Sequence, residues 1–358
     1  STGFAGNPVV QPPALDSLAA QGVVFTNSFA QNPVCMPSRA CMLTGRYPRN
    51  NGCRMDGVVM PDSETTLPKV FAENGYVTAA LGKMHFIPPK KSYGFQYMRI
   101  NDGLHFDPRE NDYRDWIKRE HPEALEAIIR DPNKGKRKEH QPFPCSIPDA
   151  LHRIHWLADE TITFLRENKD KPFFAWMSFC EPHHAFTCPQ KYLDMYNIDD
   201  MPLPSRKQGE LDYKPAHFMD MHLGRDPVYK CDFSALSDKD WRELKTYYYG
   251  MTSFVDVHIA EVIAEMEKLK LMENTIILFA SDHGELLGDH GLLFKGAFHY
   301  DCAVKIPLFI SWRGHTEPKY TDALVQEIDF MPSLLDMCGI QIPAGVQELT
   351  VRVYSADG

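Results

Sequence analysis

The chain has 358 residues, of which 43% are hydrophobic and 24% are charged, and its formal net charge is −10 at pH 7. This composition is that of an ordinary globular protein and excludes global disorder, while the length allows two conventional domains or one large α/β domain. The negative charge argues against nucleic acid as the main partner, because phosphate backbones usually bind basic surfaces, but a small anionic substrate is compatible with it.

The sequence indicates neither a membrane span nor a disulfide framework. No apolar run reaches the roughly eighteen residues that a spanning helix needs, and the first residues lack the charged and apolar regions of a signal peptide. The compartment therefore stays open. Nine cysteines, spread from Cys35 to Cys338, are too dispersed for a small disulfide scaffold, and an odd number leaves at least one unpaired.

Five short apolar runs rich in β-forming residues alternate with helical segments along the chain. They predict strands at residues 22–29, 76–81, 172–179, 274–280 and 306–312. Strands that alternate with helices are typical of a sheet covered on both faces. We therefore predict an α/β fold with a central, mostly parallel but mixed sheet sandwiched by helices.

Two helices are predicted with definite boundaries. Apolar residues recur every three or four positions over residues 240–270, which predicts a long helix lying against the sheet. A short amphipathic helix is predicted from Pro37 to about Thr44, because proline suits the first helical position and Gly45 can end the helix.

Two polar, proline-containing segments interrupt the alternation, at about residues 101–149 and 187–238. Their weak periodicity predicts long excursions over the sheet edge. Such loops often shape access to a site, and solvated connections without function are the alternative.

Polar residues follow three of the predicted strands at the points where those strands end. They are Lys83 and His85, then His183 and His184, then Asp282 and His283. Ligands of open α/β sheets bind outside the carboxyl ends of the strands. We therefore expect these three groups to converge on one rim.

The residue types in these groups suit a metal ion and a tetrahedral anion. Asp282 and His283 can give an oxygen and a nitrogen to one metal ion, although an Asp-His pair is more often only a turn. Lys83, His85 and Lys295 can bind the oxygens of an anion and donate a proton to a leaving group, although exposure on the surface is the default for lysine. His183 and His184 have the same two interpretations, since a histidine after a strand is often merely hydrogen bonded.

The segment CMPSRACMLTGR, at residues 35–46, places a cysteine at the start of the predicted short helix. A helix N-terminus is a ready site for an anion. Cys35 could be a buried apolar residue, or a thiolate whose pKa is lowered by the helix and by Arg39. Neither explanation accounts for the positions of Pro37 and Arg39, two and four residues after the cysteine.

With these motifs the chain resembles the formylglycine-dependent sulfatases of the alkaline phosphatase superfamily. Their signature, Cys-x-Pro-x-Arg followed by Leu-Thr-Gly-Arg, is matched by Cys35, Pro37, Arg39 and residues 43–46. The resemblance continues through NPVVQPPALDSLAAQGVVFTNSF, LGKMH, SFCEPHH, SDHGELLGDHGLLFKGAFHYD and VQEIDFMPSLLDMCGI, and covers nearly the whole chain. It implies an alkaline phosphatase-like fold, with a catalytic domain over residues 1–340 and the two excursions over its active-site rim. Residues 341–358 would be the truncated start of a C-terminal region.

The resemblance also implies a reaction. A separate formylglycine-generating enzyme would oxidise Cys35 to an aldehyde, and the hydrated aldehyde, beside a divalent cation, would attack the sulfur of a sulfate ester. Reforming the aldehyde would then release sulfate. The substrate would be a sulfated small molecule or saccharide, and the runner-up activity is hydrolysis of a phosphonate or phosphate ester by the same group.

Each role is carried over by its motif. Asp282, His283 and the modified Cys35 would hold the metal, Arg39 would position the modified side chain, and Lys83 would bridge it to the sulfate. His85 would be the base for sulfate elimination. His183 and Lys295 would bind the sulfate and protonate the leaving alcohol, with His183 preferred to His184 because it directly follows Pro182.

The resemblance leaves the metal and the completeness of its site open. Many relatives carry Asn where His283 stands and bind calcium through oxygen ligands, so Ca²⁺ is expected first. The imidazole nitrogen of His283 makes Mn²⁺ more acceptable, and Mn²⁺ or Mg²⁺ are the alternatives. Relatives begin with a strand that ends in two acidic metal ligands, and this chain starts after that point. We therefore expect weak metal binding, a fold that lacks its first strand and its C-terminal subdomain, and, as a competing interpretation, an inactive fragment or a noncatalytic homologue.

Overall fold

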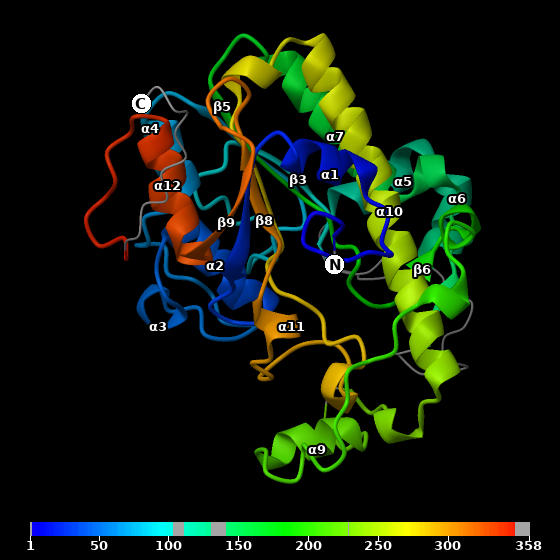
Figure 1. Ribbon diagram of the computed structural model, residues 1–358. Helices are drawn as coiled ribbons and strands as arrows, with labels where there is room; N and C mark the ends of the chain where they lie inside the picture. Colours follow the sequence, from blue (N-terminus) through cyan, green and yellow to red (C-terminus); the bar gives the residue numbers. More distant parts are fainter. Residues whose placement is uncertain (1, 103–110, 130–140, 228, 348–358) are drawn as a thin grey trace.

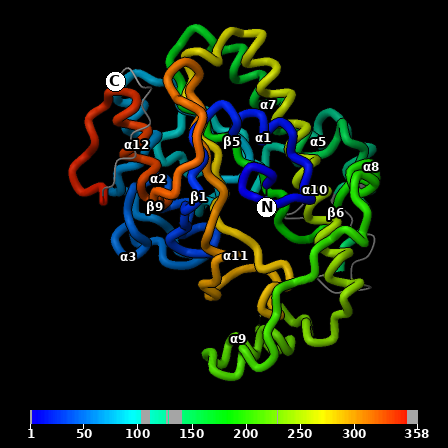
Figure 2. Tube along the Cα trace, viewed as in Figure 1, coloured from blue at the N-terminus to red at the C-terminus, as the bar shows by residue number. Residues whose placement is uncertain are grey.

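The computed structural model describes residues 2–102, 111–129, 141–227 and 229–347 (Figures 1 and 2). Its strands are β1 (Val23–Phe29), β2 (Val77–Gly82), β3 (Tyr97–Ile100), β4 (Phe143–Pro144), β5 (Phe173–Ser178), β6 (Thr187–Cys188), β7 (Ile277–Ala280), β8 (Leu308–Ser311) and β9 (Lys319–Gln326). Its α-helices are α1 (Pro13–Ala19), α2 (Cys35–Thr44), α3 (Pro48–Asn51), α4 (Leu67–Glu73), α5 (Asp112–Glu120), α6 (Pro122–Ile129), α7 (Arg153–Asn168), α8 (Gln190–Leu193), α9 (Ala216–His222), α10 (Asp238–Lys268), α11 (Asp301–Val304) and α12 (Phe330–Met337).

The described strands form two main sheets and one small one. The first main sheet has the order β7-β8-β1-β9, with β8 antiparallel to both of its neighbours and β9 parallel to β1. The second has the order β3-β2-β5 and is parallel throughout, with Val77 opposite Phe173 and Gly82 opposite Ser178. The small parallel pair is β4-β6.

A large cavity of about 1650 Å³ is lined by strands of both main sheets. Residues of β5 and of β7 both line it, and each of these strands pairs on one side only among the described residues. His183, which comes after β5, and Asp282 and His283, which come after β7, line the same cavity.

Helices cover both faces of the first main sheet (Figure 1). On one face, α1, α7 and α10 bury apolar side chains against β1 and β8, including Leu18, Leu165 and Val262 around Phe309. On the other face, α2 and α12 pack Met42 and Phe330 against the same strands. The molecule is therefore the helix–sheet–helix sandwich that the alternation of elements predicts.

The predicted elements are largely present. All five predicted strands form, as β1, β2, β5, β7 and β8, and the long helix forms as α10, displaced by two residues at each end. A capping box explains the earlier start, because the Ser237 hydroxyl accepts a hydrogen bond from the N–H of Asp240 while the Asp240 carboxylate accepts from the backbone N–H of Ser237.

The short helix differs from its prediction in two ways. α2 begins at Cys35 rather than at Pro37, which a proline in the first turn permits because the first four N–H groups of a helix need no partner within it. It is not amphipathic, since all ten of its residues are buried. Gly45 ends the helix as predicted, in the left-handed conformation with a φ of 61°.

The two polar segments contain secondary structure that the sequence pattern did not indicate. In the first, α5 and α6 place Tyr113, Ile117 and Ile128 in a buried cluster beside β2, while residues 103–110 and 130–140 lie outside the described residues. The second contains β6, α8 and α9. Parts of both segments therefore belong to the packed body of the protein.

Two expectations about the whole chain can be compared with the structure. No disulfide joins any of the nine cysteines, all of which lie in the described ranges. Among the described residues, no helix combines the length and the apolar character needed to cross a bilayer.

Candidate active site

The site is built where three elements end or begin. Lys83 follows β2, Asp282 and His283 follow β7, and Cys35 is the first residue of α2. The left-handed Gly82, whose φ is 88°, allows the chain to turn sharply between β2 and Lys83, and a Cβ there would lie 2.2 Å from the carbonyl oxygen of Ser178. The predicted convergence on one rim is therefore found for these two strand ends.

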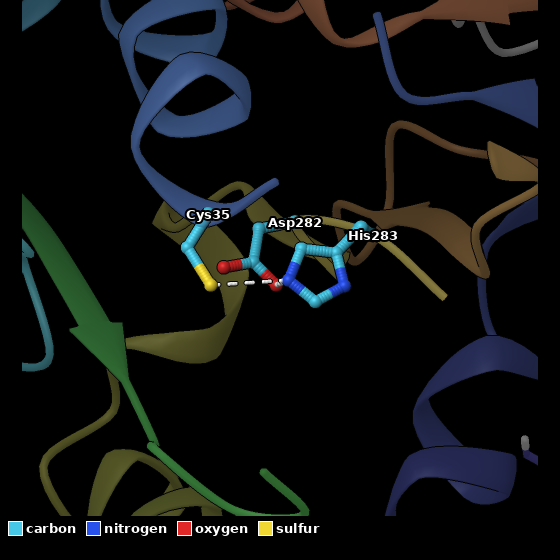
Figure 3. A group of neighbouring side chains, drawn as sticks. All are labelled: Cys35, Asp282 and His283. Carbon is cyan, nitrogen blue, oxygen red and sulfur yellow. Dashed lines mark hydrogen bonds and ion pairs between the residues drawn. The ribbon is translucent and has the colours of Figure 1, made fainter. Parts of the chain in front are cut away.

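Cys35 is at the centre of the group (Figure 3). Its Sγ lies 3.1 Å from Nε2 of His283 and 3.4 Å from Nζ of Lys83, and the residue is only 1% exposed. Figure 3 shows the Cys35 side chain pointing from the helix start toward Asp282 and His283. Whatever group stands at position 35 thus faces a carboxylate, an imidazole and an ammonium together.

Arg39 fixes the positions of Asp282 and Lys83 around Cys35. One turn after Cys35, its Nε donates to Oδ2 of Asp282 at 2.9 Å, and its Nη1 donates to the carbonyl oxygen of Lys83 at 2.6 Å and to Oγ of Ser178 at 3.0 Å. A planar guanidinium can satisfy three fixed acceptors at once, which an ammonium cannot do with the same geometry. Arg39 therefore ties the ends of β2, β5 and β7 to α2.

The charges of the group oppose the effect of its burial. Burial alone would raise the pKa of the Cys35 thiol, but Lys83, His283 and Lys295 hold that pKa well below its usual value. Burial likewise opposes ionisation of Asp282, yet His283, Arg39 and Lys83 keep its pKa well below the ordinary range. The site therefore stabilises negative charge at position 35 and at Asp282.

The donor set fits a divalent cation. Ligand atoms of Cys35, Asp282 and His283 lie within 4.8 Å of one another. Arg39 and Lys83 engage Oδ2 of Asp282, while Oδ1 lies on the side of His283, 3.7 Å from its Nε2. One carboxylate oxygen and one imidazole nitrogen therefore face the side chain at position 35, and this mixed set can hold calcium or a transition ion.

His85 lies two residues after Lys83, on a loop held by Asp102. The backbone N–H groups of Met84 and His85 donate to Oδ1 of Asp102 at 2.7 and 2.8 Å, and His85 has a positive φ of 60°. Its Nδ1 is buried and has no hydrogen-bond partner among the described residues. The ring therefore keeps a nitrogen available for a further group.

His183, His184 and Lys295 form a second polar wall. His183 Nδ1 lies 2.5 Å from the carbonyl oxygen of His184, and the two rings are 4.0 Å apart. Burial, assisted by the charge of Lys295, lowers the pKa of His183 well below its usual value and the pKa of His184 to about 3. Both imidazoles are therefore neutral near pH 7.

A buried carboxyl group, that of Glu327, contacts α2, and the sequence pattern did not indicate it. The Ser38 hydroxyl lies 2.6 Å from Oε1 of Glu327 and 2.5 Å from the carbonyl oxygen of Asp282. Glu327 is fully buried, and this burial raises its pKa well above the usual value. Its position 289 residues after Ser38 could be found only from the fold.

A buried ion pair supports the histidine wall in the same manner. Nε of Arg153, at the start of α7, lies 2.5 Å from Oε1 of Glu181, two residues before His183. Glu181 lies within the segment SFCEPHH, which drew attention through its histidines. The pairing itself joins α7 to the loop after β5, and sequence reasoning did not predict it.

Comparison with known proteins identifies relatives of this chain. The family model described as Sulfatase matches residues 1–340. The chain is 32% identical over 372 residues to an arylsulfatase of Clostridium perfringens, covering 98% of this chain and 74% of that protein. It is 30% identical to an ulvan-active sulfatase of Formosa agariphila, covering 96% of this chain and 60% of that protein. Among solved structures, the phosphonate monoester hydrolase of Agrobacterium radiobacter has a TM-score of 0.82 at 27% identity, covering 95% of this chain and 71% of that one.

Proposed function

The chain belongs to the sulfatase family, within the alkaline phosphatase superfamily, and from this we propose that it hydrolyses a sulfate ester with a formylglycine made from Cys35 and a divalent cation. The observation that carries the proposal is the meeting of Cys35, Lys83, Asp282 and His283 at the end of two strands. A formylglycine-generating enzyme would be the partner that modifies Cys35.

Asp282, His283 and the side chain at position 35 would hold the cation. When present, the hydrated formylglycine supplies the attacking hydroxyl and the cation offsets negative charge on the sulfuryl oxygens. Ca²⁺ is our first choice, with Mn²⁺ or Mg²⁺ as alternatives, because the imidazole of His283 broadens the range of ions that the set accepts.

Arg39 and Lys83 orient the reacting side chain. Arg39 fixes the Asp282 carboxylate and the backbone of Lys83, so it positions the group at residue 35 without needing to contact the substrate. Lys83 directs its ammonium group at position 35 and can hold a sulfate oxygen with its other N–H groups.

Three further side chains would move protons. His183 and Lys295 would bind the sulfate and protonate the leaving alcohol, and the low pKa that burial gives His183 means that any proton it takes up is readily given away. His85, with its unpartnered Nδ1, would take a proton from position 35 during sulfate release. The burial of the group limits access of water to these transfers.

The substrate class is a sulfated small molecule or saccharide. Support comes from the relatives, one of which is named an arylsulfatase, another an ulvan-active sulfatase and a third an N-acetylglucosamine-6-O-sulfatase. A screen of aryl and saccharide sulfates, with sulfate release measured by ion chromatography, tests this class. Release of sulfate by the wild-type protein and none by the Cys35→Ala variant supports it, and equal release by both contradicts it.

The second candidate activity is hydrolysis of a phosphonate or phosphate ester. It is favoured by the TM-score of 0.82 to a phosphonate monoester hydrolase. Sulfate and phosphonate groups are both tetrahedral anions, so the same side chains serve either one. Paired assays with an aryl sulfate and an aryl phosphonate monoester decide the order, and much faster turnover of the phosphonate would reverse our preference.

A metal titration separates both activities from the noncatalytic interpretation. Calorimetry with Ca²⁺ and Mn²⁺ on the wild-type protein and on the Asp282→Asn variant is expected to give a binding signal that the variant loses. Absence of binding to the wild-type protein would favour a noncatalytic homologue.

A further inference from the structure

A second group of metal-binding residue types lies between two helices, away from the residues of the candidate active site. His155 is on α7, and His258 and Glu261 are on α10, three residues apart and therefore on one face of that helix. Figure 1 shows α7 and α10 running side by side. One ligand atom from each of the three residues lies within 4.8 Å of the other two.

His258 is the buried member of this group. Its side chain is 4% exposed, and its Nδ1 lies 2.6 Å from Oε2 of Glu261. Its Nε2 is also buried and has no hydrogen-bond partner among the described residues. Burial lowers the pKa of His258 in spite of the nearby Glu261 carboxylate, so the ring is neutral near pH 7. Because Nδ1 is the nitrogen that faces Glu261, a metal ion would bind Nδ1, and the ring proton would then lie on Nε2.

His155 faces His258 across the helix contact. The two rings meet edge to face, with centroids 5.1 Å apart. Nε2 of His155 lies 3.3 Å from Oδ2 of Asp159, one turn further along α7. A carboxylate on the far nitrogen of a metal-binding histidine orients the ring and increases its basicity, and Asp159 is placed to do this.

We propose that His155, His258 and Glu261 form a zinc site that links α7 to α10. Two imidazoles and one carboxylate are a donor set that Zn²⁺ accepts, with water in the fourth position. Tetrahedral zinc with bonds of about 2.1 Å needs its donor atoms about 3.4 Å apart, so only modest side-chain adjustments are required. His155 and Glu261 are 31% and 44% exposed, which leaves them room to move.

The donor set also defines which ion would bind. Calcium and magnesium prefer sets made largely of oxygen, whereas this group contributes two nitrogens. The proposed site therefore differs in metal preference from the candidate active site, for which calcium is our first choice. A transition ion here would be structural, since it would join two packed helices.

The location gives the ion a way to stabilise the protein. α7 begins with Arg153, whose ion pair with Glu181 supports the loop that carries His183. An ion bound only by the folded arrangement of α7 and α10 raises the free energy of unfolding by mass action. Zinc should therefore raise the midpoint of thermal unfolding at concentrations above its dissociation constant.

The test uses the full chain in a Cys35→Ala/His283→Ala background, which removes two donors of the candidate active site. Zinc binding is measured by competition with a chromophoric chelator, and Co²⁺ is added separately to detect the visible bands of a tetrahedral site. We expect one zinc ion per chain, a tetrahedral Co²⁺ spectrum with nitrogen ligands, and a higher unfolding midpoint with zinc.

Two exposed variants and one control keep the test independent of folding defects. His155→Gln and Glu261→Gln alter partly exposed side chains, so they should fold, and each should weaken zinc binding by about 10-fold or more. His315→Gln, which changes an exposed histidine outside the group, should bind zinc as the background does. The proposal is overturned if the background protein binds no zinc, or if His155→Gln and Glu261→Gln bind it with unchanged affinity.

Discussion

At the scale of single residues, the site depends on polar side chains that satisfy several partners at once. Arg39 shows how much of this a sequence can reveal. Its distance from Cys35 and Pro37 identified it as part of a motif, but its three acceptors, on the ends of β2, β5 and β7, come from segments up to 243 residues away. The residue could be predicted, whereas the contacts that explain its need for a guanidinium could not.

Replacing Arg39 should destabilise the metal-free protein strongly. Arg39→Met removes the one partner within 3 Å of the buried Asp282 carboxylate and leaves it Lys83 at 3.8 Å and His283 at 3.7 Å, and breaking a buried pair costs about 3 kcal/mol or more. Arg46→Met is the matched control, because the Arg46–Glu64 pair is partly exposed and should be worth about 1 kcal/mol or less. Urea unfolding of both variants measures the difference, and equal losses would refute the bracing role of Arg39.

Glu327 is expected to act as a neutral hydrogen-bonding group. Since burial raises its pKa well above the usual value, Glu327→Gln should change the free energy of unfolding by less than about 1 kcal/mol. Glu327→Ala removes the partner of the Ser38 hydroxyl and leaves space in the core, and should cost about 2–3 kcal/mol. If the glutamine variant is as unstable as the alanine variant, the carboxyl group is ionised and our account of it is wrong.

At the scale of elements, the pattern of hydrophobic residues predicted strands and helices well, whereas the pattern of polar residues did not. The five apolar runs all became strands, but only β1, β2 and β8 bury most of their side chains, whereas those of β5 and β7 are mostly half-buried beside the cavity. β9 was missed because Val325 is its one fully buried residue, and backbone pairing with β1 holds it in place. α2 was predicted as amphipathic, but its polar residues Ser38, Arg39 and Thr44 are all buried, each with specific hydrogen-bond partners.

The contact between α1 and α10 should make stability depend on pH. Asp256 accepts hydrogen bonds from the N–H groups of Ala14 and Leu15, and its burial raises its pKa to about 6. A carboxyl group with a raised pKa in the folded state contributes stability that is complete below its unfolded pKa, near 4, and is lost as pH rises through about 6. The free energy of unfolding of the wild-type protein, minus that of Asp256→Asn, should therefore fall between pH 4 and pH 6.

The expected size of this fall is about 2 kcal/mol. A difference of two pKa units corresponds to a free energy of about 2.7 kcal/mol, and solvent screening reduces it. Denaturant unfolding at several pH values from 4 to 7 measures it, and the difference should level off above pH 7. A difference between the two proteins that is constant across this range would contradict the raised pKa of Asp256.

At the scale of the whole molecule, the division of the strands into two main sheets is the feature that most affects the site. Candidate site residues follow the carboxyl ends of both β5 and β7, and both strands line the cavity of about 1650 Å³ and have an edge with no partner among the described strands. The sequence predicted the strands and their order along the chain. It could not give their pairing, which depends on contacts between distant segments.

Hydrogen exchange should report this division for the 358-residue chain. Amides of β2 and β8, which have a paired strand on each side, should exchange slowly, whereas the amides of β5 and β7 that face the cavity should exchange much faster. Exchange followed by NMR or by mass spectrometry of short peptides distinguishes them. Uniform protection of all four strands would mean that the edges of β5 and β7 are covered.

The central claim is that the group built around position 35 performs ester hydrolysis only after the Cys35 thiol has become an aldehyde. The most direct measurement compares aryl sulfate turnover across protein preparations whose conversion at position 35 has been determined by mass spectrometry of the peptide containing it. We predict that the rate rises in proportion to the converted fraction and is negligible in protein that retains the thiol. Full turnover by the unconverted protein would contradict the account.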